Sequence, residues 1–320
     1  MSIYLVPCGI SVLDNLALLR GAPRDDLPVV EALDELMAWA AAQVEVGPPL
    51  LRAWHRDCAD TVAGIRLPEW NGQVSAELST LAKQTGIDRP RVTDRDSIVL
   101  LASQTTKGLL AGLLTATYLT GGAGERIRHS ATHPRGLAGP SAPGRGSPDY
   151  GLSRGHVCLV TVNGLRPREG DGFRAAAGGI GDVMRAVRDH AGTEPIEVHL
   201  TGGFKAILMH TLALAEILKS TAQDRASVTA WYLADGEEDW WVTEADEIGL
   251  RCFNPDTLGV LRNELADVAG RRPVQSDEYR GVAWEMGYGD TPILNAFGHG
   301  YRAMLGDPGA VTDEGEDVHR

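Results

Sequence analysis

The stretch EVHLTGGFKAILMHTLALAEIL, residues 197–218, combines a strand end, a glycine turn and a helix in one run. Residues 197–200 have a strand pattern, Thr201-Gly202-Gly203 is a tight-turn sequence, and apolar residues recur at helical spacing from Phe204 onward. Glycines let the backbone approach a ligand, and the free N–H groups at a helix start attract anions. Lys205 in the first turn opposes the helix dipole unless it meets an external anion. The stretch favours a phosphate-binding turn, although an ordinary strand–turn–helix with a solvated lysine explains the same residues.

Composition limits the class of ligand. The 320 residues carry a net charge of −13 and are 43% hydrophobic, which is normal for a globular protein. An acidic chain lacks the broad basic face that a long nucleic acid requires, so we expect no such partner. Only four of the 30 basic residues are lysines, which makes a lysine beside a glycine turn more notable. A small anion in a local basic pocket stays compatible with this balance.

Targeting and metal-binding signals are weak. The N-terminal residues MSIYLVPCGIS have no basic segment followed by a long apolar run, and no stretch reaches the roughly 18 apolar residues of a membrane span. The four cysteines are too widely spaced for a zinc site. We therefore expect a cytoplasmic protein without membrane contact, metal or cofactor.

Two further segments repeat the strand–turn–helix design. Residues 3–6 form an apolar run that ends in Gly9-Ile10-Ser11, and residues 97–102 form another that ends in Ser103-Gln104-Thr105. Carboxyl ends of parallel strands meet at one edge of a sheet, where open α/β folds bind ligands. The three turns are thus predicted to converge on one crevice. Alternatively, Ser11 acts only as a helix N-cap.

The remaining pattern predicts an α/β fold with a mostly parallel sheet flanked by helices. We divide the chain into a domain over residues 1–250 and a small helical appendage over 251–320, ending in a disordered acidic tail. The expected helices are 28–46, 50–63, 73–85, 172–190, 255–269, 276–286 and 292–305, and the expected strands include 125–129, 156–163, 228–233 and a hairpin partner at 240–243. A Gly, Pro, Ser and Arg-rich loop over 132–155 is either a lid or a solvated excursion.

Common nucleotide motifs are absent from the sequence. It has no Walker A lysine. The GxGxxA match at residues 298–303 is too close to the C-terminus to open a βαβ unit, so a nicotinamide site is not favoured.

The order and spacing of the turns resemble the CARF domains of type III CRISPR systems, and in particular the branch that includes stand-alone ring nucleases. The first family motif runs Gly-Thr-Ser-Leu-Leu-x-Asn; here Gly9, Ser11 and Asn15 match, and Ile10 replaces the threonine. The later motif, Thr-Gly-Gly-x-Lys, is matched in full by Thr201 to Lys205. The turn at Ser103 resembles a Ser-x-Glu-Thr turn with Gln104 in place of the acid. The resemblance covers about residues 1 to 250.

This resemblance implies a homodimer with a modified Rossmann fold that binds a cyclic oligoadenylate, most simply cyclic tetra-adenylate, across its two-fold axis. It assigns Ser11 and Lys205 as the catalytic residues of a metal-independent ring nuclease that ends type III antiviral signalling. The implied ligand-binding residues are Gly9, Ile10, Asn15, Ser103, Gln104, Thr105, Thr201, Gly202, Gly203 and Phe204. Two alternatives stay open: a sensor without cleavage, whose appendage binds DNA or a partner, and an unrelated nucleotide-binding Rossmann protein.

Overall fold

The computed structural model describes residues 2–18, 27–43, 50–65, 74–132, 149–165, 172–202, 205–222, 226–233, 245–287 and 290–305. Its main sheet consists of the strands β1 (Ile3–Cys8), β2 (Ser97–Ser103), β3 (Ile127–Ala131), β4 (Val157–Val162), β5 (Ile196–His199), β6 (Val228–Leu233) and β7 (Ala245–Ile248). The helices before residue 250 are α1 (Ser11–Leu18), α2 (Leu27–Gln43), α3 (Leu50–Asp57), α4 (Ala59–Ile65), α5 (Ala76–Thr85), α6 (Thr106–Leu119), α7 (Gly172–Ala191) and α8 (Lys205–Ala222). The chain alternates strands and helices, as predicted for an α/β protein.

Within the described residues the sheet has the strand order β3-β4-β2-β1-β5-β6-β7. All neighbouring pairs are parallel except β6 and β7, which are antiparallel at one edge. The register pairs Leu5 of β1 with Val99 of β2 and Val198 of β5. The mostly parallel, helix-flanked sheet that the sequence predicts is therefore confirmed, and it is Rossmann-like.

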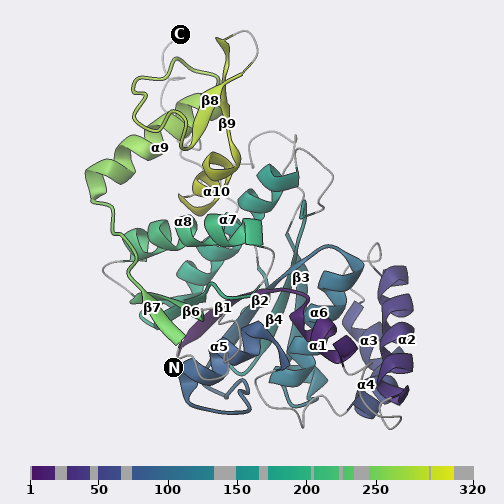
Figure 1. The fold of residues 1–320 in the computed structure, drawn as a ribbon. Helices are drawn as coiled ribbons and strands as arrows, with labels where there is room; N and C mark the ends of the chain where they lie inside the picture. The colour runs from purple at the N-terminus through teal and green to yellow at the C-terminus, as the bar shows by residue number, and fades with distance from the viewer. Residues whose placement is uncertain are drawn as a thin grey trace, which may run out of the picture.

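Both faces of the sheet are buried, because the central strands are continuously apolar. Successive side chains of β1 enter different cores: Leu5 packs with α7 and α8, and Val6 packs with α1, α5 and α6. Figure 1 shows the same arrangement, with α7 and α8 on one side of the sheet and α1 to α6 on the other. Between β1 and β2, helices α2 to α5 fall on the segments 28–46, 50–63 and 73–85, where the sequence predicts helices, and the segment 50–63 is divided into α3 and α4.

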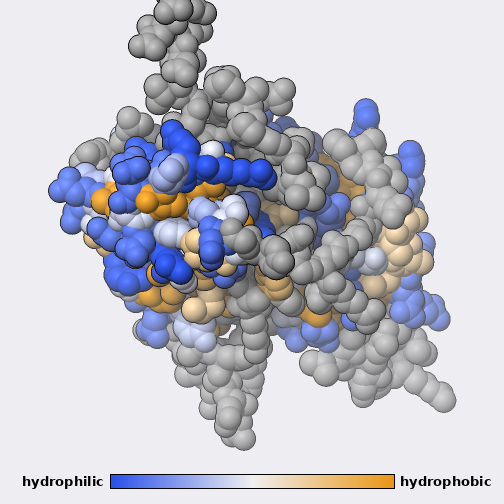
Figure 2. Space-filling view, turned by 90° about the horizontal axis from the view of Figure 1, so that it is seen from above, coloured by the Kyte–Doolittle hydropathy of each residue, from blue (hydrophilic) through white to orange (hydrophobic). Residues whose placement is uncertain are grey.

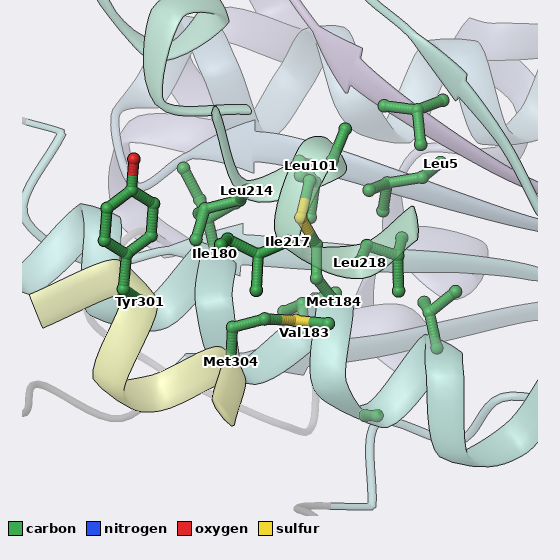
Figure 3. Packing of buried hydrophobic residues seen from close by; sticks show 14 of the residues in the cluster. Leu5, Leu101, Ile180, Val183, Met184, Leu214, Ile217, Leu218, Tyr301 and Met304 are labelled. Atoms are coloured by element: carbon green, nitrogen blue, oxygen red, sulfur yellow. The ribbon is translucent and has the colours of Figure 1, made fainter. Parts of the chain in front are cut away.

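The C-terminal segment forms a further layer over α7 and α8 (Figure 1). It contains α9 (Pro255–Ala269), the antiparallel pair β8 (Trp284–Met286) and β9 (Pro292–Leu294), and α10 (Ala296–Leu305). Figure 3 shows Tyr301 and Met304 of α10 against Ile180 and Val183 of α7 and against Leu214 of α8. These residues belong to the core on that face of the sheet, so this segment and the sheet share one apolar core.

The helices predicted over 276–286 and at the start of 292–305 are wrong. Trp284 and Leu294 pair across the two short strands, and Gly281 adopts a positive φ of 80° that interrupts a helix. Trp284 is buried, and its Nε1–H donates to Glu264 Oε2 of α9 at 2.7 Å. Burial of this indole against α9 thus overrides the local helical pattern.

The outer surface of this segment is mixed in polarity. Figure 2, seen from the side of the C-terminal segment, shows hydrophilic residues with smaller hydrophobic patches between them. Val282 and Met286 are among the exposed large apolar side chains of the chain. Isolated apolar side chains of this kind are normal on protein surfaces.

Several sequence predictions fall outside the described residues: most of the 132–155 loop, the strand at 240–243 and the tail after residue 305. In the part of the chain that the structure describes, the antiparallel partner of β6 is β7, at 245–248. No helix among the described residues is long and apolar enough to cross a membrane.

Candidate functional site at the ends of β1 and β5

The strand order places a topological switch point between β1 and β5. Helix α1 follows β1 and packs into the core on one face of the sheet, whereas α8 follows β5 and packs on the opposite face. Where neighbouring parallel strands send their helices to opposite faces, the turns after the strands separate and leave a crevice. The turn at Gly9–Ser11 and the turn at Thr201–Gly202 are therefore the two walls of the candidate site.

The side chain of Glu77, from the first turn of α5, lies between these walls. Its Oε1 accepts a hydrogen bond from the backbone N–H of Gly9, and its Oε2 accepts from the Ser11 hydroxyl at 3.0 Å. On the other wall, a Cβ added to Gly202 would lie 2.5 Å from Oε1 of Glu77. Glu77 is only 1% exposed. A buried carboxylate thus bridges the two turns that the sequence predicts to hold an anion.

Ser11 and Asn15 of helix α1 form hydrogen bonds with the residues at the start of α5. The Ser11 Oγ accepts from the N–H of Ala76 at 3.2 Å while its hydroxyl hydrogen goes to Glu77. Asn15, one turn further along α1, donates from Nδ2 to the carbonyl oxygen of Val74 at 2.9 Å. The predicted ligand-binding side chains of α1 are therefore directed toward α5, and Ile10 is the exposed residue of this turn, at 39%.

Two contacts position the turn after β5: a hydrogen bond of Thr201 and the close approach of Gly202 to Glu77. Thr201 Oγ1 accepts from the N–H of Leu233 at 2.8 Å, which continues the pairing of β5 with β6 beyond the strand end. Gly202 is buried, and its φ is not in the left-handed region, so the backbone conformation does not require a glycine. A glycine is required because the Glu77 side chain occupies the space that a Cβ would fill. The turn therefore brings the backbone of Gly202 close to the side chain of Glu77.

The third predicted turn, after β2, lies beside Gly9, because Cys8 pairs with Ala102. Ser103 Oγ and Thr105 Oγ1 are 2.9 Å apart, and Thr105 caps α6 by accepting from the N–H of Gly108. The backbone N–H of Gln104 donates to the carbonyl of Val162. These hydroxyls serve the start of α6, so this turn forms the flank of the crevice.

Lys205 begins α8, directly after the β5 turn. Its side chain, together with Gly203 and Phe204, lies outside the described residues. The described backbone therefore places the predicted lysine at the start of the helix that leaves the crevice.

Two buried groups near the crevice are held in their neutral forms. Burial, followed by the nearby Glu77 charge, raises the pKa of the Cys8 thiol well above its usual value, which makes this thiol a poor nucleophile. Burial lowers the pKa of His199, the last residue of β5, to about 3. His199 Nε2 donates to Gln84 Oε1 of α5 at 2.6 Å, so α5 is tied to the sheet at its far end as well.

No local pattern in the sequence indicates that Glu77 lies beside the Gly9–Ser11 turn. Local pattern places it as a first-turn acid of α5, where an acidic residue favourably meets the helix dipole. Its burial follows from α5 packing back against β1 and β6 across about 65 intervening residues. Among the described residues, no cluster of three or more His, Cys, Asp or Glu side chains has the arrangement of a metal site.

No protein-family model and no curated protein matches this sequence.

Proposed function

We propose that this protein binds a cyclic oligoadenylate at the crevice between β1 and β5 and cleaves it without a metal. The observation that carries the proposal is that the Gly9–Ser11 and Thr201–Gly202 turns follow two neighbouring parallel strands, β1 and β5, whose helices pack on opposite faces of the sheet. Backbone N–H groups at helix starts and glycine turns suit the phosphates of such a ring. Two copies of the chain, each contributing one crevice, would match the two-fold symmetry of cyclic tetra-adenylate.

The cleavage step needs positioning more than strong acids or bases. A ribose 2′-oxygen attacks the adjacent phosphorus, the new O2′–P bond forms as the P–O5′ bond breaks, and the 2′-hydroxyl proton is lost while O5′ takes one up. The products are a 2′,3′-cyclic phosphate and a free 5′-hydroxyl. In the proposal, Ser11 orients the attacking hydroxyl and Lys205 stabilises the charge on the phosphorane-like transition state.

A sensor without cleavage is the second candidate. Helix α8 starts at Lys205 and packs against α7 and α10, so it connects the β5 turn to the C-terminal segment. A ligand that moved the start of α8 would change the position of that segment, which would then carry the output to a partner.

The test is incubation of the purified protein with cyclic tetra-adenylate and cyclic hexa-adenylate in EDTA, followed by chromatography. We expect linear fragments with a cyclic phosphate end, and a loss of at least about 100-fold in rate for Lys205→Ala and Ser11→Ala. Lys219→Ala is the matched control, because Lys219 lies about 21 Å along the same helix and should leave the rate unchanged. Binding without conversion would support the sensor, and no binding of either ring would refute both functions.

A further inference from the structure

The hydrogen bonds of Glu77 use the donors that a ligand in the crevice would need. A backbone amide has one hydrogen and a serine hydroxyl has one hydrogen. The hydrogen of Gly9 N–H points to Glu77 Oε1, and that of the Ser11 hydroxyl points to Glu77 Oε2. Neither group can donate to a phosphate while these bonds persist.

The carboxylate also occupies the place and supplies the charge of an anion. It lies at the start of α1, where helix N–H groups favour a negative group, and Glu77 is itself an acidic residue in the first turn of α5. The backbone of Gly202 closes the other side, and Glu77 is almost fully buried. A phosphate brought to the same donors would therefore meet a like charge within a few ångström, in surroundings where water screens it weakly.

We propose that Glu77 is a built-in competitor: its carboxylate holds the anion position of the crevice, and an anionic ligand binds only by displacing it. The inference rests on the proposed function for the identity of the ligand, and it requires only that the ligand be an anion. It makes the structure described here the closed state of the site.

Displacement requires a side-chain rotation and leaves the fold in place. Asn15 donates to the carbonyl of Val74, two residues before α5, and His199 donates to Gln84 near the other end of the helix. When the Glu77 side chain turns away, the bonds from Gly9 and Ser11 pass to the ligand. Part of the binding energy is spent on this exchange, which weakens the apparent affinity of the unmodified chain.

The experiment measures inorganic phosphate binding by the shift in thermal unfolding temperature at constant ionic strength, for the unmodified chain and for Glu77→Gln. Glutamine keeps the size of the side chain and removes its charge. We expect a phosphate dissociation constant lower by about tenfold or more in Glu77→Gln, because the like charge is gone. Equal affinity in the two proteins, or phosphate binding to neither, would overturn the proposal.

Glu264→Gln is the matched control. Glu264 is also 1% exposed and accepts from the N–H groups of Glu278 and Tyr279, but it lies in α9, away from the crevice. Both glutamine variants lose charge-assisted hydrogen bonds, so both should lose stability. A purely structural role for Glu77 predicts that neither gains phosphate affinity; the proposal predicts a gain in Glu77→Gln alone.

Glu77→Asp serves if the glutamine variant does not fold. Its shorter side chain withdraws the carboxylate from Gly9 and Ser11 but keeps the charge, so a smaller gain in phosphate affinity is expected, and no gain would count against the proposal. Repeating the titration with cyclic tetra-adenylate separates the two inferences. If Glu77→Gln gains affinity for inorganic phosphate but no protein binds cyclic tetra-adenylate, only the proposed function is refuted. If cyclic tetra-adenylate binds but the affinity for phosphate is equal in all variants, only the competitor role of Glu77 is refuted.

Discussion

The pH dependence of stability should report the neutral, buried state of His199. Its pKa is about 3 in the folded protein, lowered by burial, against about 6.5 when unfolded. The side chain is fully buried and donates to Gln84, and its Nδ1 has no hydrogen-bond partner among the described residues. Because the folded pKa is lower, the unfolded chain binds more protons between pH 6.5 and 3. The contribution of neutral His199 to the stability of the folded protein is therefore fully present above pH 6.5 and is lost as the pH falls from 6.5 to 3.

The magnitude follows from the pKa difference. Each pH unit below 6.5 costs about 1.4 kcal/mol of folding free energy for one such group. Between pH 7.5 and 5.5, His199 should therefore lower the free energy of unfolding by about 1.4 kcal/mol. The assay is urea unfolding at both pH values, for the unmodified chain and for His199→Gln, whose amide can still donate toward Gln84.

Between pH 7.5 and 5.5, we expect the free energy of unfolding to fall by about 1.4 kcal/mol less in His199→Gln than in the unmodified chain. The control is His190→Gln, which makes the same replacement at an exposed position at the end of α7. Burial also lowers the pKa of His129 to about 4, but this second contribution is common to all three proteins and cancels in the comparison. The same loss in His199→Gln and the unmodified chain would refute the reasoning.

Two further predictions test the packing. Gly181→Ala would push a methyl group into the carbonyl of Gly300 and should cost about 1–3 kcal/mol in urea unfolding, whereas Gly178→Ala, whose Cβ would lie 4.0 Å from the nearest neighbour, should be neutral or stabilising by up to about 1 kcal/mol. Equal effects of the two would contradict the close α7–α10 crossing. Brief alkylation followed by mass spectrometry should label the exposed Cys252 and leave the buried Cys8, Cys58 and Cys158 unmodified until urea is added. Rapid labelling of Cys8 in the folded chain would show that the end of β1 is open.

Local sequence patterns determine the strands and most of the helices before residue 250. The apolar runs at β1, β2 and β4 predict strands buried on both faces, and each has both faces covered in the structure. The glycine turns predict where the sheet leaves room for a ligand, since parallel strands bring their carboxyl ends to one edge. The pattern failed at β8, where a short strand is fixed by Trp284 binding Glu264, a contact that no local period contains.

Sequence alone thus determined the α/β class, the approximate places of β1, β2, β4, β5 and β6, and the choice of Gly9, Ser11 and Gly202 as candidate residues, because each depends on residues close together in the chain. Only the tertiary structure decided what fills the crevice between them. Glu77 reaches Ser11 across 66 positions, and its burial depends on α5 packing back over the sheet. Hydrophobic periodicity specifies which face of a helix is buried, but it does not specify which distant strand end a polar side chain of that helix will meet.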